Sequence, residues 1–479
     1  MLRIYNTLTR RTEEFHPIND QLVGFYSCGP TVYDYAHIGH ARTYVFNDIL
    51  QRILEFDGYR VKRVMNITDV GHLTSDQDTG EDKMEKGAAR EKKSVWEIAD
   101  FYTRDFFKML SQLNIRKPDI IIKATDYVPQ MIELIKILEK KGFTYTISDG
   151  VYFDTEKLPD YGKLTGMNFE ELQQSLKAGA RVEVVPGKKH PTDFALWKFS
   201  PATASGLPKR QMEWDSTWGK GFPGWHIECS VMGMAVLGNH FDVHTGGVDH
   251  IQVHHTNEIA QSEAATGEKF VNYWLHGEHL LVDGQKMSKS LGNFYRVEDI
   301  VKKGFDPLAL RYLFLTASYR MQMNFTWEAL QSAQNALKNF KFEILNLKSK
   351  NGLERTVLSE DKLKKVDDYR QKFTDAVNDD LNTPKALAVS WEVLKSNIPS
   401  PDKYDLIMFF DEVLGLDLKN AKLKMQNAKI PAEVMELVKR REELRKKGKF
   451  EEADRVREEI KDKGYEVEDT TTGSLIKKN

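Results

Sequence analysis

Residues 22–69 read LVGFYSCGPTVYDYAHIGHARTYVFNDILQRILEFDGYRVKRVMNITD. The first six residues form a short apolar run that Cys28-Gly-Pro interrupts, which is typical of a buried strand. Apolar residues then recur at helical spacing over 41–56, an Asp-Gly pair ends that helix, and 60–69 predicts a second strand. A strand, a helix and a strand in so short a stretch form a βαβ unit. The stretch therefore predicts an α/β fold built on a parallel sheet.

The pattern changes twice further along the chain. Short strands with glycine and proline between them fill 142–208, which indicates an insertion into the first fold. The alternation of helix and strand then returns, and after Pro307 we expect the chain to be almost wholly helical. Helices are predicted at 94–113, 127–141, 224–237 and 249–266, with a strand at 241–244.

Composition bounds the class of protein. The chain has 479 residues, a net charge of −2, 29% charged residues and two cysteines. About three domains of ordinary composition are expected, which excludes wholesale disorder and collagen-like repeats. No window approaches the roughly 18 apolar residues of a membrane span, and the first residues lack the apolar core of a signal peptide. Two cysteines are too few for a disulfide framework, so we expect a cytoplasmic protein without membrane association.

The first motif is DYAHIGHAR at 34–42, between the first strand and the first helix. Ligands of parallel α/β sheets bind at the carboxyl ends of strands, where helix N-termini favour phosphate. Gly39 lets a nucleotide approach the backbone, and His37 and His40 share one face from which both can donate to phosphate oxygens. Two ordinary surface histidines at a turn would explain the motif equally well if it stood alone.

The second motif is KMSKSLGN at 286–293. Lys286 and Lys289 on a polar loop suit an anion clamp, which stabilises the charge that develops when the α-phosphate of a nucleotide is attacked. A solvated loop is the commoner fate of such residues. The two motifs in this order on this fold make that alternative improbable.

A third feature is a cluster of histidines. Six of the thirteen histidines fall between 226 and 255. His254 and Glu258 are four residues apart on a predicted helix and share a face. With one sulfur each from Cys28 and Cys229 they would make a four-ligand set suited to zinc. Spacing alone leaves open that both cysteines are buried small hydrophobic residues.

These motifs carry a resemblance to a known family. The HIGH sequence at 37–40 and the KMSKS sequence at 286–290 resemble those of class I aminoacyl-tRNA synthetases. Residues 27–40, the stretch GWHIECS at 224–230 and the stretch HHTNEIAQS at 254–262 resemble the cysteinyl-tRNA synthetase family. The resemblance implies that L-cysteine is activated with ATP, releasing pyrophosphate, and then transferred to tRNA(Cys).

The same resemblance implies roles for individual residues. One Zn²⁺ per chain and Mg²⁺ with ATP are the implied cofactors, and His244 is implied to lie on the adenosine side. The implied residues are His37, His40, Lys286 and Lys289 for catalysis; His37, Gly39, His40, Gly247, Asp249, Met287, Ser288 and Lys289 for ATP; Gly29, Thr31, Thr68 and Trp225 for the substrate cysteine; and Cys28, Cys229, His254 and Glu258 for the metal.

The resemblance further implies a domain order and a monomer. The C-terminal region is expected to bind tRNA, where Arg440, Arg441, Lys446 and Lys447 would lie against phosphates, although a solvated helix would show the same charge run. The implied parts are a Rossmann-type catalytic domain at 1–115 and 224–285, a connective insertion at 116–223, a KMSKS and stem-contact region at 286–324, a helical bundle at 325–416, and an anticodon-side domain at 417–479.

Some positions depart from the family pattern, and one alternative ligand and two alternative functions stay open. His255 is an alternative to His254 as a ligand. A ligase that joins cysteine to an amino sugar in mycothiol synthesis would share the catalytic core, and a zinc-stabilised nucleic-acid adaptor could retain the fold without activity. Cysteine-dependent pyrophosphate exchange and tRNA charging separate these alternatives. The unusual residues near the metal helix are His250, Gln252, Val253 and Thr256.

Overall fold

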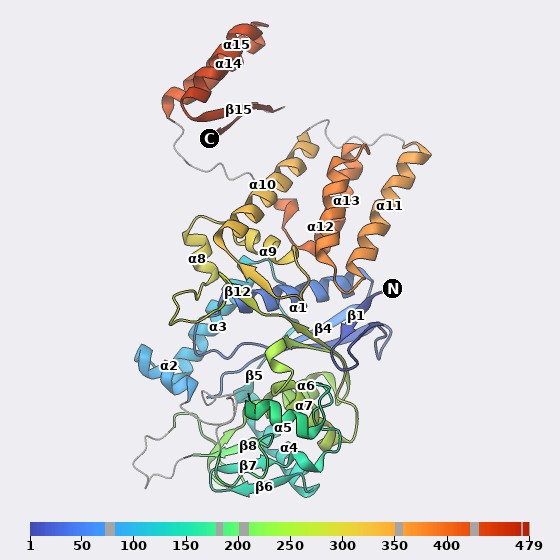
Figure 1. The fold of residues 1–479 in the computed structure, drawn as a ribbon, viewed down its shortest axis with the longest axis vertical. Helices are drawn as coiled ribbons and strands as arrows, with labels where there is room; N and C mark the ends of the chain where they lie inside the picture. The colour runs from blue at the N-terminus through green and yellow to red at the C-terminus, as the bar shows by residue number, and fades with distance from the viewer. Residues whose placement is uncertain are drawn as a thin grey trace. The chain divides into compact units, whose positions relative to one another are not determined.

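The chain folds into two compact units, each described here by itself (Figure 1). This computed structural model describes residues 1–71, 82–178, 185–200, 210–349, 358–421, 431–470 and 473–478. The first unit takes in 1–334, 372–388 and 412–416, and the second takes in 335–371, 389–411 and 417–479. Within the described residues, no helix is both long and apolar enough to cross a membrane.

A five-stranded parallel sheet forms the core of the first unit, as the α/β prediction requires. The predicted strand at 22–27 is confirmed at both ends, and the strand predicted from residue 60 begins there and ends at Ile67. The strands β4 and β5 are added on one side of β3, and the later strands β10 and β11 are added on its other side. The strand order therefore reverses between β3 and β10. The order is β11 (Val271–Gly277), β10 (Phe241–Gly247), β3 (Leu22–Ser27), β4 (Arg60–Ile67) and β5 (Ile120–Lys123).

Helices pack on both faces of this sheet. Neighbouring residues of a strand point to opposite faces. On one face, Arg63 donates to Ser27 Oγ (3.2 Å) and to Gln51 of α1 (3.3 Å). On the other face, Tyr26 packs against Phe241 and α6. The covering helices include α1 (Ile38–Phe56), α6 (Trp225–Leu237) and α7 (His254–Thr266), and α6 packs against α7.

A second, antiparallel sheet is inserted between β5 and α6, which confirms the predicted change to short strands. The strand β5, which lies just after the predicted boundary at residue 115, pairs with β4 in the parallel sheet. The helix α4 (Val128–Lys140) packs against α6 and α7 and also contacts the inserted strands β6 and β9 (Figure 1). The inserted strands are β6 (Thr144–Ile147), β7 (Gly150–Phe153), β8 (Phe194–Phe199) and β9 (Gly221–Pro223), in that order.

Smaller elements complete the first unit. The helix predicted at 94–113 is confirmed as α3, which Ser94 and Glu97 begin with a reciprocal capping box. The remaining elements are β1 (Arg3–Asn6), β2 (Arg11–Glu14), α2 (Lys83–Glu91), α3 (Val95–Gln112), η1 (Ala124–Tyr127), α4 (Val128–Lys140), η2 (Thr155–Lys157), α5 (Phe169–Ala178), η4 (Val248–His250), β12 (Leu280–Val282), β13 (Gln285–Lys286), α8 (Val297–Lys302), α9 (Pro307–Leu315) and β14 (Met323–Phe325).

The C-terminal half is mainly helical, with one exception to the prediction. Val434 and Val438 of α14 pack with Ile460 of α15 and Val467 of β15 in a small core of their own. The hairpin of β15 and β16 was expected to be helix, and the alternation of Tyr465 and Val467 with glutamates explains why it is a strand pair. The elements are α10 (Trp327–Ser349), α11 (Glu360–Val377), α12 (Thr383–Lys395), α13 (Ser400–Leu414), η5 (Leu418–Asn420), α14 (Ala432–Lys446), α15 (Phe450–Asp462), β15 (Tyr465–Thr470) and β16 (Gly473–Lys478).

Candidate active site and metal centre

The candidate site lies at the carboxyl ends of β3 and β10, where strand order reverses. Cys28 follows β3, and its backbone N–H donates to the carbonyl of Thr245 on β10 (3.2 Å). The chain then continues from β3 into α1 and from β10 through η4 into α7. Ligands of open parallel sheets bind in the crevice that such a reversal creates. The topology therefore brings the HIGH segment and the histidine-rich helix to one place.

His37 and His40 cap the N-terminus of α1. His37 Nδ1 accepts from the backbone N–H groups of Gly39 (3.0 Å) and His40 (3.3 Å), and His40 Nδ1 accepts from His37 N–H (3.1 Å). Each accepting Nδ1 is unprotonated, so each ring carries its proton on Nε2. Burial and the neighbouring ring lower the pKa of His37 to about 2, and burial lowers that of His40 as well. Both rings are thus neutral donors, available to phosphate oxygens.

The KMSKS loop lies against the HIGH segment. Ile38 N–H donates to the Tyr295 carbonyl (2.9 Å), and the His37 ring meets the edge of Phe294 at a centroid distance of 5.0 Å. A Cβ at Gly39 would lie 2.5 Å from Met287 Cε and 2.7 Å from His37 Cε1, so the absence of a side chain lets the two motifs approach closely here. The two predicted nucleotide motifs, far apart in sequence, therefore form one surface.

Within the loop, the predicted residues differ in their surroundings. Ser288 N–H donates to Asn293 Oδ1 (2.7 Å), which closes the turn. Lys286 is exposed at the end of β13, and Lys289 donates to Asp34. Lys289 thus faces the HIGH segment, and Lys286 faces solvent.

Gly247 ends β10, which contacts the HIGH helix α1, and Asp249 follows in η4. Burial opposes the charge of Asp249, but His250, the backbone and the more distant His279 and His40 outweigh it and lower the pKa of Asp249. A Cβ at Gly247 would lie 2.3 Å from Asp249 Oδ1, so the Asp249 carboxylate packs closely against this glycine. An ionised carboxylate therefore stands at the edge of the predicted nucleotide surface.

The four predicted metal ligands come together. Cys28, Cys229, His254 and Glu258 are all buried, and one donor atom of each lies within 4.8 Å of the others. Glu258 Oε1 accepts no hydrogen bond from the described residues, although His254 Nε2 is 3.0 Å away. Two sulfurs, an imidazole and a carboxylate are a donor set that suits zinc. These side chains fit a zinc ion.

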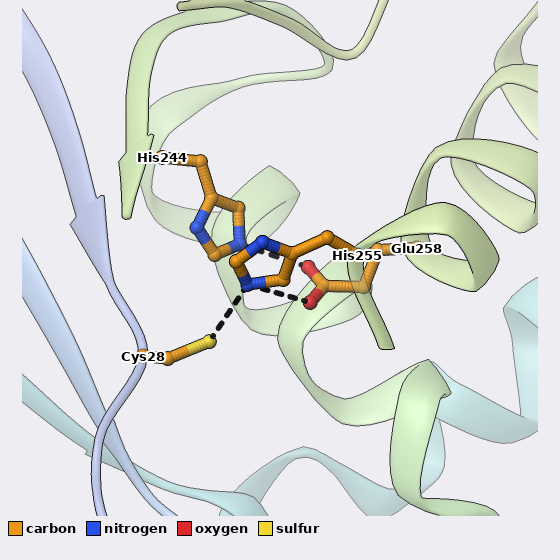
Figure 2. A group of neighbouring side chains, drawn as sticks. All are labelled: Cys28, His244, His255 and Glu258. Atoms are coloured by element: carbon orange, nitrogen blue, oxygen red, sulfur yellow. Dashed lines mark hydrogen bonds and ion pairs between the residues drawn. The ribbon is translucent and has the colours of Figure 1, made fainter. Parts of the chain in front are cut away.

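A second grouping shares two of these side chains. Cys28, His244, His255 and Glu258 also have donor atoms within 4.8 Å of one another, and Figure 2 shows them turned toward each other. His255 Nε2 lies 3.4 Å from Cys28 Sγ, and His244 Nε2 lies 2.9 Å from Glu258 Oε2. His244, which was expected on the adenosine side, is instead fully buried beside the metal group. His255 keeps its place as an alternative ligand.

Hydrogen bonds orient the histidines of this cluster. His226 Nδ1 pairs with His254 Nδ1 (2.9 Å), so His254 Nε2 faces Glu258. His255 Nδ1 pairs with His276 Nε2 (2.8 Å), whose Nδ1 pairs with the Thr7 hydroxyl (2.8 Å). Sequence reasoning did not assign roles to His226 or His276. The density of histidines in the sequence between 226 and 255 pointed to His226. His276 lies outside that stretch, and the pairing of β10 with β11 brings it beside His255.

In the absence of a cation, Cys229 and His254 hold protons, whereas Glu258 is ionised. The hydrogen bond with Cys28 and burial raise the pKa of the Cys229 thiol well above its usual value. Burial opposes the charge of His254, but Glu258 and a hydrogen bond with Cys229 prevail and raise its pKa to about 10. Burial likewise opposes ionisation of Glu258, yet His244 and His254 lower its pKa to about 2. A cation that binds here must displace protons.

The predicted cysteine pocket borders this cluster. Trp225 opens α6 and stacks on the His254 ring at 4.3 Å between centroids. Thr31 forms a parallel bridge with Thr68, whose hydroxyl donates to the Glu228 carboxylate (3.2 Å). A Cβ at Gly29 would lie 1.6 Å from the Asn66 carbonyl oxygen, so this position admits only glycine. Gly29, Thr31 and Trp225 thus lie on segments that carry the metal group, and Thr68 follows the neighbouring strand β4.

The unusual residues before α7 have local partners. The Thr256 hydroxyl donates to the Ile251 carbonyl (2.7 Å), and Val253 occupies the N-cap position, where its carbonyl accepts from Asn257 N–H (2.9 Å). The His250 ring stands edge-on to Trp225 at 6.1 Å. The turn that leads into α7 is therefore closed by backbone and hydroxyl contacts.

Three models of known protein families match most of the chain. Residues 14–335 match the family described as "tRNA synthetases class I (C) catalytic domain". Residues 372–396 match the DALR domain, and residues 427–474 match the "Cysteinyl-tRNA ligase anticodon binding domain".

Full-length relatives agree with these matches. The chain is 47% identical to cysteine–tRNA ligase 1 of Burkholderia lata over 99% of this chain and 96% of that protein. It is 44% identical to the cysteine–tRNA ligase of Treponema denticola over 100% of this chain and 99% of that protein. Among solved structures, methionyl-tRNA synthetase of Mycobacterium tuberculosis with methionyl-adenylate aligns at a TM-score of 0.56 and 15% identity, covering 83% of this chain and 90% of that one. That last likeness concerns the fold alone.

Proposed function

This chain belongs to the cysteine–tRNA ligases of class I, and we propose that Cys28, Cys229, His254 and Glu258 hold one zinc ion that recognises the substrate cysteine. The enzyme activates L-cysteine with ATP and transfers it to tRNA. The observation that carries the proposal is the convergence of these four buried side chains beside the cysteine pocket. When bound, zinc would take the substrate thiol as a thiolate, a ligand that a serine hydroxyl matches poorly.

Selection of cysteine is the reason that a metal suits this pocket. Apolar pockets separate near-isosteres by only about 10–200-fold. Trp225 stacks on His254, and Gly29 directly follows Cys28 in the chain, so the proposed pocket adjoins two of the proposed ligands. Recognition of sulfur by a metal in this position would supply discrimination that shape cannot.

For the nucleotide, we propose that two neutral histidines and two lysines bind the phosphates of ATP. The Nε2–H groups of His37 and His40 would donate to phosphate oxygens, and Lys286 and Lys289 would stabilise charge at the α-phosphate as pyrophosphate leaves. Mg²⁺ would arrive with ATP. Gly39, Gly247, Asp249, Met287 and Ser288 are proposed to complete the ATP surface.

Pyrophosphate exchange and charging test this function. Exchange of labelled pyrophosphate into ATP should depend on cysteine, and transfer to tRNA(Cys) should follow. The amino-sugar ligase alternative is not supported, because residues 427–474 match an anticodon-binding domain. Exchange without charging of tRNA(Cys) would contradict the proposal. A monomeric state, a cytoplasmic location and the predicted domain limits stay predictions.

Zinc affinity is expected to fall as the pH falls. The Cys229 thiol and the His254 imidazolium hold protons when no cation is bound, because their pKa values are raised. Binding must remove those protons and the one on Cys28, about three in all near neutral pH. Titration of zinc into metal-free protein in buffers of different ionisation enthalpy measures the number released. Release of no protons would contradict the ligand set.

The basic run on α14 is predicted to contact tRNA with fewer residues than the sequence indicates. Arg440 and Lys447 are exposed, whereas Arg441 is 1% exposed and belongs to the interior, which corrects its predicted place in the patch. Replacing Arg440 and Lys447 by glutamine should raise the KM for tRNA several-fold and reduce its salt slope by about two. Arg441→Gln should lower stability and leave the slope unchanged. An unchanged slope in the double variant would show that the face is merely solvated.

A further inference from the structure

Asp34 joins the two nucleotide motifs through the lysine on which the proposed ATP chemistry depends. Lys289 Nζ donates to Asp34 Oδ2. The side chain of Asp34 is 15% exposed and that of Lys289 is 55% exposed. Asp34 stands three residues before His37, so the contact spans from the HIGH segment to the KMSKS loop. In this state the ammonium group is paired with a carboxylate.

The carboxylate is held independently of the lysine. Asp34 Oδ1 accepts from Tyr35 N–H (2.8 Å), and Oδ2 accepts from Arg90 Nη1 (3.2 Å). Arg90 is fixed in turn, because Nη2 donates to the Tyr33 carbonyl (3.3 Å) and the Tyr102 hydroxyl (2.9 Å). Asp34 therefore keeps hydrogen-bond donors and a compensating charge after Lys289 departs.

The lysine is placed beside the nucleotide surface. Lys289 Nζ lies 5.3 Å from the centroid of Phe294, whose ring meets His37. The loop turns tightly here, with Gly292 N–H donating to the Lys289 carbonyl (3.2 Å) and Gly292 at φ 67°. A small change in this turn or in the lysine rotamers would carry the ammonium from Asp34 toward the HIGH histidines.

We propose that Asp34 is a positioning residue that holds the Lys289 ammonium in the ATP-free enzyme and yields it to the triphosphate. The inference rests on the proposed role of Lys289. A triphosphate carries more negative charge than one carboxylate, so it attracts the Lys289 ammonium more strongly than Asp34 does. Arg90 then continues to compensate the charge of Asp34. The carboxylate competes with ATP, and ATP affinity is set lower than Lys289 alone would give.

Binding of MgATP in the absence of cysteine tests the competition. Asp34→Asn should lower the Kd for MgATP by about 1.5- to 5-fold, the range of an exposed ion pair. The gain should disappear in a Lys289→Met background and shrink at about 0.3 M salt, where such charges are screened. Glu133→Gln is the matched control, because it removes another exposed ion pair, with Lys136 on α4, and should leave the Kd unchanged.

The outcomes separate this inference from the proposed function. Weaker ATP binding in Asp34→Asn, or an equal change with and without Lys289, would overturn the inference. If Lys289→Met alone leaves ATP affinity and pyrophosphate exchange unchanged, the proposed role of Lys289 fails instead. Asp34→Ser, which also removes the carboxylate, gives the same test should the asparagine variant not fold.

Discussion

Replacing Cys229 by serine is expected to remove zinc and abolish cysteine activation. The substitution exchanges one sulfur for oxygen in a buried group whose donor atoms lie within 4.8 Å of one another. Oxygen of a neutral hydroxyl is a poor zinc ligand, and loss of even outer partners of a metal costs about 10–100-fold. Zinc content should fall from about one per chain to near zero, and pyrophosphate exchange should fall by more than about a hundredfold.

Metal analysis and exchange assays on the same preparations check this expectation. Met232→Leu serves as the control, because Met232 is buried on the same helix, α6, and the change conserves volume. It should keep both zinc and activity. Normal zinc content in Cys229→Ser would refute the four-ligand set and favour the grouping of His244 and His255 with Cys28 and Glu258.

Replacing Arg311 by methionine is expected to destabilise the first unit strongly. Arg311 and Asp48 are 0% exposed, and Arg311 Nη2 donates to Asp48 Oδ2 (2.6 Å). Arg311 also donates to the carbonyls of Leu414 (2.8 Å) and Leu113 (3.0 Å). Removing one partner of a buried ion pair costs about 3–5 kcal/mol, because the other charge and its acceptors stay buried. Arg52, which also pairs with Asp48 (2.7 Å), would compensate only in part.

Thermal unfolding followed by calorimetry measures this loss. The melting temperature of the first transition should fall by several degrees. Lys136→Met, which removes an exposed ion pair with Glu133 on α4, should change stability by no more than about 0.5 kcal/mol. Equal effects of the two substitutions on stability would contradict the predicted contribution of the buried Arg311–Asp48 ion pair.

Local signals in the sequence predicted much of the fold. The strand at 22–27 was placed correctly because an apolar run is bounded by turn residues. The helix predicted at 249–266 begins instead at His254, since η4 occupies the preceding turn. The hairpin at 465–478 was missed, although its alternating pattern was visible in the sequence. Short strands with little apolar content are easily overridden by the helical character of their neighbours.

The proposed metal ligands could be named from the sequence, but their surroundings could not. The family resemblance implied Cys28, Cys229, His254 and Glu258, which the structure brings together, whereas His276 and Asp34 gained their partners from sheet register and from the placement of one loop. Arg441 was assigned to a charged surface because it lies in a basic run, yet it shares the buried face of Val434 and Val438. Helical periodicity, and not charge density, decides which side chains of α14 face the interior.

Selection of cysteine by the buried metal group is tested most directly by comparing two amino acids on one enzyme preparation of known zinc content. Pyrophosphate exchange is measured with cysteine and with serine, on zinc-loaded protein and on protein from which zinc has been removed. The ligand set Cys28, Cys229, His254 and Glu258 predicts exchange with cysteine that requires about one zinc per chain and exceeds exchange with serine by well over the 10–200-fold that shape alone provides. Exchange with cysteine that persists without zinc, or a cysteine-to-serine ratio within that range, would contradict it.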